Sequence, residues 1–179
     1  MLTEAIPTMR SEYTSWRTEG LPQGDLNKDS AVMAMRSLRR PLIIDPVGLI
    51  STWLGHARLE NDIRLMPLDG DNFTRELCSA IKMGFEVMVT GITHGNIPSI
   101  LLPILENRTY VGDKGKIYIK IAGNTLPYDP KFRMYLFTSE MDPVLAPRFR
   151  RLLNVINFGF NRKGVEAALV EFIINIDPI

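Results

Sequence analysis

Residues 41–53 read Pro41-Leu42-Ile43-Ile44-Asp45-Pro46-Val47-Gly48-Leu49-Ile50-Ser51-Thr52-Trp53. The apolar run from Leu42 to Ile44 has the length of a buried strand, and it stops at a turn pair of Asp and Pro. After the glycine, apolar residues recur at helical spacing, with Trp53 and Leu54 expected to pack on a sheet. The stretch therefore predicts a strand, a tight turn and a helix, the unit on which α/β nucleotide-binding modules build a phosphate cradle.

The turn at Asp45, Pro46 and Gly48 lacks the chemistry that binds phosphate. A phosphate loop needs converging backbone N–H groups, several glycines, a Lys for the outer phosphates and a Ser or Thr for the metal. Pro46 has no N–H, and no Lys or Arg occurs between Arg40 and Arg58. Asp45 would repel a phosphate by roughly 4 kcal/mol per unit charge at about 4 Å and an effective dielectric of about 20. We interpret the turn as a degenerate phosphate-loop position and expect neither a nucleotide cofactor nor a metal.

Length and composition predict one globular domain. The chain has 179 residues, 45% of them hydrophobic, and a net charge of +1, which argues against a dedicated nucleic-acid or membrane-surface binder. A single cysteine, Cys78, cannot form an internal disulfide, so we expect a reducing compartment and a structural role for this thiol. No apolar run approaches the roughly 18 residues of a membrane span. The expected localisation is cytoplasmic, with no nucleic acid and no membrane as partner.

Strands and helices alternate along the rest of the chain. We expect strands at 42–44, 63–65, 87–90, 134–138 and 153–158, and helices at 27–38, 49–54, 73–84, 97–105 and 165–174. Asn27 is expected to cap the first helix and Leu38 to lie on its apolar face, and Gly84 to end the 73–84 helix. Residues 116–126 read as a β-hairpin that turns at Gly123-Asn124. The predicted fold class is α/β: a P-loop NTPase-like, three-layer α/β/α fold with a central, mostly parallel five-stranded sheet and an inserted β-hairpin.

The third expected strand lacks the acidic groups that an ATPase places at its end. One such group would lie near Mg²⁺ and another would orient the attacking water, yet no carboxylate occurs from Val87 to Leu105. His94 follows this strand between two turn signals, and we interpret it as a loop residue rather than a catalytic base. The second half of an ATPase site is thus missing independently of the first.

Short stretches in a fixed order resemble a known family. They are Gly20-Leu21-Pro22; residues 41–46 with Gly48 and Trp53; Asn72-Phe73 with Ala80-Ile81 and Gly84; Tyr128-Asp129-Pro130-Lys131-Phe132-Arg133-Met134-Tyr135; Pro143; Pro147; and Ile156-Asn157-Phe158 with Gly164. In order and spacing they resemble the fifth AAA+ module of dynein heavy chains, over nearly the whole chain after residue 15. The resemblance implies a lead-in arm at residues 1–24 and a single AAA+ large subdomain at 25–179. Because the sequence stops at Ile179, the family's small helical subdomain and buttress hairpin are expected to be absent.

The resemblance also implies a function. The expected role is a structural, non-nucleotide-binding ring module that transmits conformational change between neighbouring AAA+ modules of one heavy chain. The parent protein would be a microtubule-dependent ATPase of the cytoskeleton, axonemal or cytoplasmic, while this module would be no enzyme itself. The family's Asp-Pro-Gln-Gly-Gln-Ala run is altered at 45–50, and its acidic run near Thr90 to Gly95 is lost, which suggests a divergent paralogue. Two alternatives stay open: an ATP-binding or ATP-hydrolysing domain with an atypical loop, and a free-standing interaction domain derived from a motor gene.

Arg148, Arg150 and Arg151 lie between Pro147 and the fifth expected strand. In AAA+ rings the corresponding region faces the nucleotide of the adjacent subunit, where an Arg can stabilise the charge of the transferring phosphoryl group. We consider these three arginines as inter-module donors. The alternative is a solvated basic face, because the resemblance requires no Arg at any of the three positions.

Overall fold

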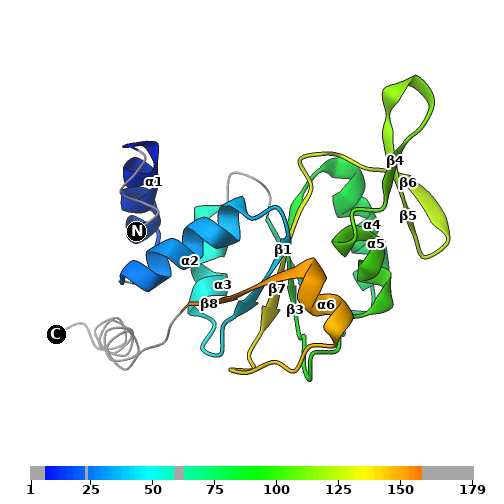
Figure 1. The fold of residues 1–179 in the computed structure, drawn as a ribbon. Coiled ribbons are helices and arrows are strands. Elements are labelled where there is room, and N and C mark those ends of the chain that lie inside the picture. Colours follow the sequence, from blue (N-terminus) through cyan, green and yellow to red (C-terminus); the bar gives the residue numbers. More distant parts are fainter. Residues whose placement is uncertain (1–6, 23, 59–62, 159–179) are drawn as a thin grey trace.

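The centre of the fold is a five-stranded sheet in which every neighbouring pair of strands is parallel (Figure 1). The computed structural model describes residues 7–22, 24–58 and 63–158. The strands are β1 (Arg40–Ile44), β2 (Arg64–Pro67), β3 (Glu86–Thr90), β7 (Arg133–Thr138) and β8 (Leu153–Asn157), in the spatial order β2-β3-β7-β1-β8. The predicted five-stranded sheet is confirmed, and it is parallel throughout.

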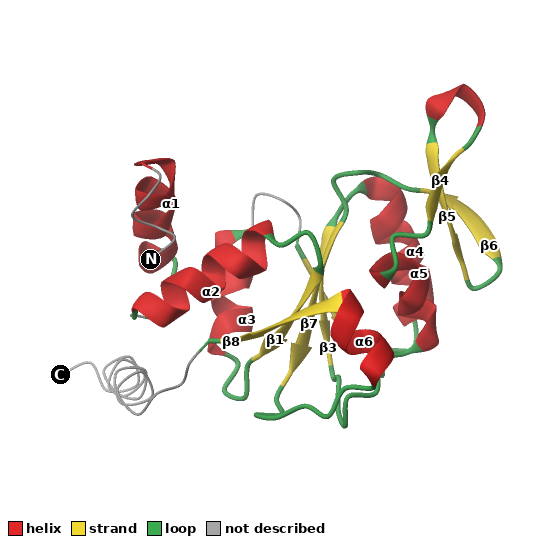
Figure 2. Ribbon diagram, in the orientation of Figure 1, coloured by secondary structure: helices red, strands yellow, loops and turns green. Residues whose placement is uncertain are grey.

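Helices cover both faces of this sheet, which confirms the three-layer α/β/α prediction (Figure 2). One face carries α1 (Pro7–Thr18), α2 (Asp25–Arg36) and α3 (Leu49–Ala57); the other carries α4 (Phe73–Met83), the 3₁₀ turn η2 (Ser99–Leu101), α5 (Leu102–Leu105) and α6 (Pro147–Leu152). Successive strand residues point to opposite faces, so Leu42 joins the core under α4 whereas Ile43 joins the core under α3.

Two helices show how local sequence sets these layers. In α3, Ile50, Trp53 and Leu54 are fully buried, as expected from their spacing. In α4, a strongly amphipathic helix, the apolar face is buried and Gly84 ends the helix with φ of 73°. The left-handed conformation at Gly84 closes α4 at the predicted residue.

The segment between α5 and β7 forms a separate antiparallel sheet that projects from the domain (Figure 1). Its strands are β4 (Thr109–Val111), β5 (Ile117–Ile121) and β6 (Asn124–Pro127), and the 3₁₀ turn η3 (Asp113–Gly115) joins the first two. The hairpin turn consists of Ala122 and Gly123, both with positive φ, rather than Gly123-Asn124. The predicted hairpin is present, and the prediction missed its third strand.

The start of the domain corrects two sequence predictions. Helix α2 begins at Asp25, so Asn27 lies in its first turn, buried, and its side-chain amide donates to the carbonyl oxygen of Pro22 at 3.2 Å instead of capping the helix. The helix ends at Arg36, which leaves Leu38 97% exposed instead of on a buried face.

In β2, Met66 is the buried residue and Leu65 is exposed. The helix predicted at 165–174 lies outside the described residues.

The N-terminal segment packs on the α2–α3 face. Trp16 of α1 meets Trp53 of α3 edge to face, with ring centroids 5.9 Å apart. Glu12 of α1 forms an ion pair with Arg36 of α2 at 2.8 Å. Helix α1 is therefore part of the outer layer over the core that contains Trp53.

Candidate functional site

The loop after β1 is organised by Asp45. Its backbone N–H donates to the carbonyl oxygen of Thr138 at the end of β7, at 2.8 Å. Its carboxylate Oδ2 accepts the backbone N–H of Ser51, the third residue of α3, also at 2.8 Å. Asp45 is only 7% exposed, and its Oδ1 is buried with no hydrogen-bond partner among the described residues. A buried carboxylate thus sits at the N-terminus of α3.

Other polar groups around this loop also form hydrogen bonds within the chain. Gly48 precedes α3 in the left-handed conformation, with φ of 79°. The hydroxyls of Ser51 and Thr52 both donate to the carbonyl oxygen of Gly48, at 3.0 and 2.8 Å. Pro46 has no N–H to offer. The structure therefore places Asp45, Pro46 and Gly48 together in the loop after β1, where Asp45 Oδ2 and the Gly48 carbonyl oxygen accept hydrogen bonds from the first residues of α3.

The loop after β3 is bound by Glu140, a residue that sequence reasoning missed. Glu140 follows β7, and its Oε1 accepts the backbone N–H of His94 at 2.6 Å; the His94 Nδ1 lies 3.5 Å from the same oxygen. The imidazole itself is solvent-exposed, and His94 has a positive φ of 52°. An acid directly after a predicted strand is a signal that could have identified Glu140, but its partner on another loop is set by the tertiary fold.

The loops after β3 and β7 are in direct backbone contact. A Cβ added to Gly95, which has φ of 60°, would lie 2.0 Å from the carbonyl oxygen of Val144. Together with the Asp45 N–H bond to Thr138, this contact links the loops that follow β1, β3 and β7 at one edge of the sheet. This edge, outside the carboxyl ends of the strands, is where open parallel sheets bind ligands.

The three candidate arginines lie exposed on the short helix α6. The Arg150 Nε–H donates a hydrogen bond to the carbonyl oxygen of Leu145 at 3.2 Å. The Arg148 guanidinium lies 4.6 Å from the Phe149 ring centroid. The Arg151 side chain has no hydrogen bond, ion pair or ring contact to another described residue. Within the described ranges no hydrogen bond or ion pair joins any of the three to Asp45, so the two candidate groups are separate.

A buried ionic cluster lies at the opposite edge of the sheet. Glu86, at the start of β3, accepts a hydrogen bond from the Tyr135 hydroxyl at 3.1 Å and pairs with Arg58 at 3.2 Å. Burial raises the pKa of Tyr135, and the Glu86 carboxylate raises it further. This cluster ties the C-terminal end of α3 to β3 and β7.

Three further findings concern metals, the single cysteine and membranes. In the described part of the chain, no group of three or more His, Cys, Asp or Glu side chains could hold a metal ion. Burial raises the pKa of the Cys78 thiol. Among the described helices, none has the length and apolar character needed to cross a bilayer.

The parallel sheet, its strand order and the loop after β1 define an α/β module of the AAA+ type. The family described as the ATP-binding dynein motor region matches residues 14–177, and the chain belongs to this family.

Similar proteins include heavy chains from several dynein classes. Dynein axonemal heavy chain 6 of Homo sapiens is 25% identical over 166 residues, 93% of this chain. Cytoplasmic dynein 2 heavy chain 1 of Chlamydomonas reinhardtii is 34% identical over 164 residues, 89% of this chain. The dynein-1-beta heavy chain of the flagellar inner arm I1 complex of Chlamydomonas reinhardtii is 27% identical over 160 residues, also 89% of this chain. The chain spans 4% of the length of each of these relatives.

Proposed function

We propose that this chain is the large subdomain of the fifth AAA+ module of a dynein heavy chain and that it serves the motor ring as a structural element without binding nucleotide. The observation that carries the proposal is the Asp45 carboxylate at the N-terminus of α3, hydrogen-bonded to Ser51. In a nucleotide-binding module the N–H groups at this helix end face a phosphate. Here the module's own carboxylate accepts one of them.

Electrostatics supports this assignment. A phosphate placed beside Asp45 would be repelled by roughly 4 kcal/mol per unit charge at about 4 Å and an effective dielectric of about 20. No Lys or Arg lies between Arg40 and Arg58 to offset that repulsion, and the Arg58 guanidinium pairs with Glu86. Displacing Asp45 would also break its hydrogen bond to Ser51. Nucleotide binding would therefore be opposed by both repulsion and the loss of a native contact.

The loop after β3 supports the same conclusion for hydrolysis. The Glu140 carboxylate reaches this loop and accepts the His94 backbone N–H. A carboxylate that holds a loop in this way is committed to structure rather than to orienting an attacking water. The parent motor would hydrolyse ATP at other modules of the ring.

The role in the ring follows from the relatives, which are axonemal and cytoplasmic dynein heavy chains. By analogy, this module contacts neighbouring AAA+ modules of the same heavy chain, works on the cytoskeleton, and meets the microtubule only through the parent motor. Residues 25–179 form the large subdomain and residues 1–24 the lead-in arm. Bonds between the loops after β1, β3 and β7 suit an element that transmits movement as a unit.

We propose that the arginines of α6 donate to the nucleotide site of a neighbouring module. Arg151 is exposed and has no partner among the described residues, so it is the best placed of the three to reach another module. Replacing Arg148, Arg150 and Arg151 with Ala in an intact heavy chain should weaken the nucleotide-dependent behaviour of the preceding module. Unchanged ATPase activity and motility in that variant would assign them to a solvated basic face.

An NMR titration tests the absence of nucleotide binding. The Ser51 amide should keep its resonance when Mg²⁺·ADP is added to the purified chain at millimolar concentration, because its N–H is already bound to Asp45. A saturable shift of Ser51 and its neighbours would favour an ATP-binding domain with an atypical loop.

A gene that encodes no other motor modules would favour the free-standing interaction domain.

A further inference from the structure

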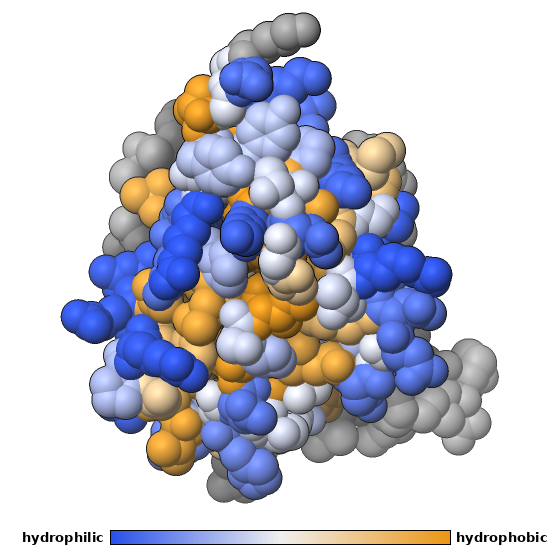
Figure 3. All heavy atoms as spheres, turned by 90° about the vertical axis from the view of Figure 1, so that its right-hand side faces the viewer, coloured by the Kyte–Doolittle hydropathy of each residue, from blue (hydrophilic) through white to orange (hydrophobic). Residues whose placement is uncertain are grey.

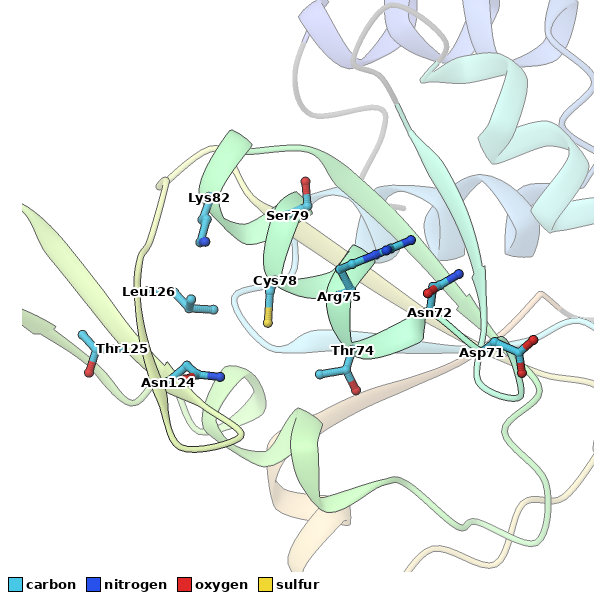
Figure 4. Close-up of a pocket in the computed structure, with 10 residues that line it drawn as sticks. All are labelled: Asp71, Asn72, Thr74, Arg75, Cys78, Ser79, Lys82, Asn124, Thr125 and Leu126. Atoms are coloured by element: carbon cyan, nitrogen blue, oxygen red, sulfur yellow. The ribbon is translucent and has the colours of Figure 1, made fainter.

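A groove lies between helix α4 and strand β6 of the projecting sheet, and Asp45 is not among the residues that line it (Figure 4). Its volume is about 750 Å³. Strand β6 packs against α4 while β5 packs against α5, so the groove lies where the projecting sheet meets α4. Hydrophilic side chains surround a hydrophobic centre on this side of the molecule (Figure 3).

The first wall of the groove is an unpaired strand edge. Strand β6 pairs with β5 on one side, and no described strand pairs with its other side. The register places Asn124 opposite Ile121 and Leu126 opposite Ile119, and the Tyr128 N–H donates to the Ile117 carbonyl oxygen. Hydrogen-bonded and non-hydrogen-bonded pairs alternate in an antiparallel ladder. Thr125 lies between Asn124 and Leu126 and is therefore in a non-hydrogen-bonded pair, so its N–H and C=O point away from β5. The edge therefore offers main-chain groups to an added strand.

The second wall is one face of α4. Thr74, Cys78 and Lys82 are spaced four residues apart, so they line up along the helix, on the side turned toward β6 (Figure 4). Arg75 also lines the groove, and neither Arg75 nor Lys82 forms an ion pair with a described residue. Asp71 is the one carboxylate among the described lining residues, so the lining carries net positive charge.

The spacing of the two cations matches an extended chain. Arg75 and Lys82 are seven residues apart on α4, about 10 Å along the helix axis at 1.5 Å per residue. An extended strand covers about 10 Å in three residues. Carboxylates about three residues apart on a strand beside α4 would therefore match the spacing of the two cations. Lys82 lies on the β6 side of α4, whereas the Arg75 side chain lies along α4 toward Asn72 and would turn toward β6 to meet the peptide (Figure 4).

We propose that the α4–β6 groove binds an extended acidic peptide segment of a partner protein, which adds as a strand to the outer edge of β6. Main-chain bonds to Thr125 would hold the peptide, and Arg75 and Lys82 would select its carboxylates. Pro127 lacks an N–H and limits the added strand to the few residues beside β6, which also protects this edge from uncontrolled pairing. This inference goes beyond the structural role in the ring and does not depend on it.

The test is a selection followed by a titration. A displayed library of random nine-residue peptides is selected on the full 179-residue chain, and an enriched peptide is then titrated into the ¹⁵N-labelled chain. The expected enriched peptides carry carboxylates two to four positions apart, weaken in high salt, and shift the amides of Asn124, Thr125 and Leu126.

Four variants make the test specific. Thr125→Pro removes the outward N–H without touching the bonds of β6 to β5, and should weaken binding about fivefold, as expected for one hydrogen bond. Thr125→Ala keeps that N–H and should bind normally. The double variant Arg75→Glu, Lys82→Glu should weaken binding by about tenfold or more, while Arg39→Glu, an exposed charge reversal elsewhere, should not. An unchanged spectrum away from β6 shows that each variant is folded.

Several results would overturn the proposal. They are the absence of enrichment, enrichment of basic or purely apolar peptides, shifts confined to another surface, and equal affinity for Thr125→Pro and Thr125→Ala. A dimer of the chain that is lost in Thr125→Pro would overturn it as well, because the occupant of the edge would then be a second copy.

Discussion

Asp45 holds the loop after β1 through two hydrogen bonds. Its N–H fixes the loop to β7, and its carboxylate satisfies the Ser51 N–H at the start of α3. A carboxylate also suits the positive end of the helix dipole. The same residue therefore stabilises the native loop and repels a phosphate.

Substitution of Asp45 measures its structural contribution. Asp45→Ala leaves the Ser51 N–H without its acceptor and should lower the free energy of unfolding by about 1 kcal/mol, as for the loss of a helix cap. Asp45→Asn keeps an acceptor oxygen and should lose less. Urea unfolding of both variants is the measurement, and a fully stable Asp45→Ala would show that the hydrogen bond contributes little.

Tyr135 predicts an alkaline pH dependence. Burial, followed by the charge of Glu86, raises the pKa of Tyr135 above its ordinary value of 10.0, so the native state holds this proton more tightly than the unfolded chain. The resulting stability is complete below pH 10 and is lost as the pH rises from there toward the native-state pKa. Tyr135→Phe should remove this slope and lose about 1 kcal/mol at neutral pH, because its hydrogen bond to Glu86 is gone. Parallel pH profiles for both proteins would contradict the assignment.

At the scale of elements, Trp53 helps to hold α3 in its layer. The indole is 1% exposed and touches the rings of Trp16 and Phe158 at centroid distances of 5.9 and 6.2 Å. Trp53→Ala should lower the free energy of unfolding by roughly 3 to 5 kcal/mol. Trp53→Phe should lose less, because the indole N–H has no partner among the described residues. A loss below about 1 kcal/mol for Trp53→Ala would contradict this packing.

The contact between the loops after β3 and β7 predicts an intolerant glycine. Gly95→Ala combines a positive φ with a Cβ 2.0 Å from the Val144 carbonyl oxygen, and should destabilise by about 3 kcal/mol from steric overlap and backbone strain. Gly115→Ala is the matched control, since φ is 73° but nothing lies within 4 Å; it should lose only about 1 kcal/mol. Equal losses from thermal unfolding would show that the loops can separate.

The elements that sequence predicts well here are those whose signals are local. The strand and turn at 42–46 and the α4 pattern ending at Gly84 are encoded in adjacent residues. Asn27 was misplaced because the turn upstream of α2 uses its side chain to bind Pro22, and Leu38 because the helix stops early. Strand β4 was missed because all three of its residues are exposed and show no apolar alternation.

The candidate site divides in the same way. The prediction that Asp45, Pro46 and Gly48 form a loop unsuited to phosphate rests on residue types alone. Its mechanism is not, because the bond from Ser51 to Asp45 and the approach of Glu140 to His94 depend on how three loops meet. Contacts between residues far apart in sequence require the packed sheet.

At the scale of the whole molecule, the chain combines an AAA+ type sheet with loops that bind each other. Asp45 to Thr138 joins the loop after β1 to β7, and Glu140 to His94 joins the loops after β7 and β3. The edge that would hold a nucleotide in an active module is thereby cross-linked by internal hydrogen bonds. These links would serve the proposed role, in which the module passes on the movement of its neighbours without its own cycle of nucleotide binding and release.

Titration calorimetry of the purified chain with ATP and with ADP, each with Mg²⁺ and at millimolar nucleotide, tests this account most directly. We expect no saturable heat for either nucleotide, because a buried carboxylate lies at the N-terminus of α3 and no Lys or Arg occurs between Arg40 and Arg58 to offset its charge. Saturable, Mg²⁺-dependent binding would contradict the central claim that Asp45 has converted this loop from a nucleotide site into a structural one.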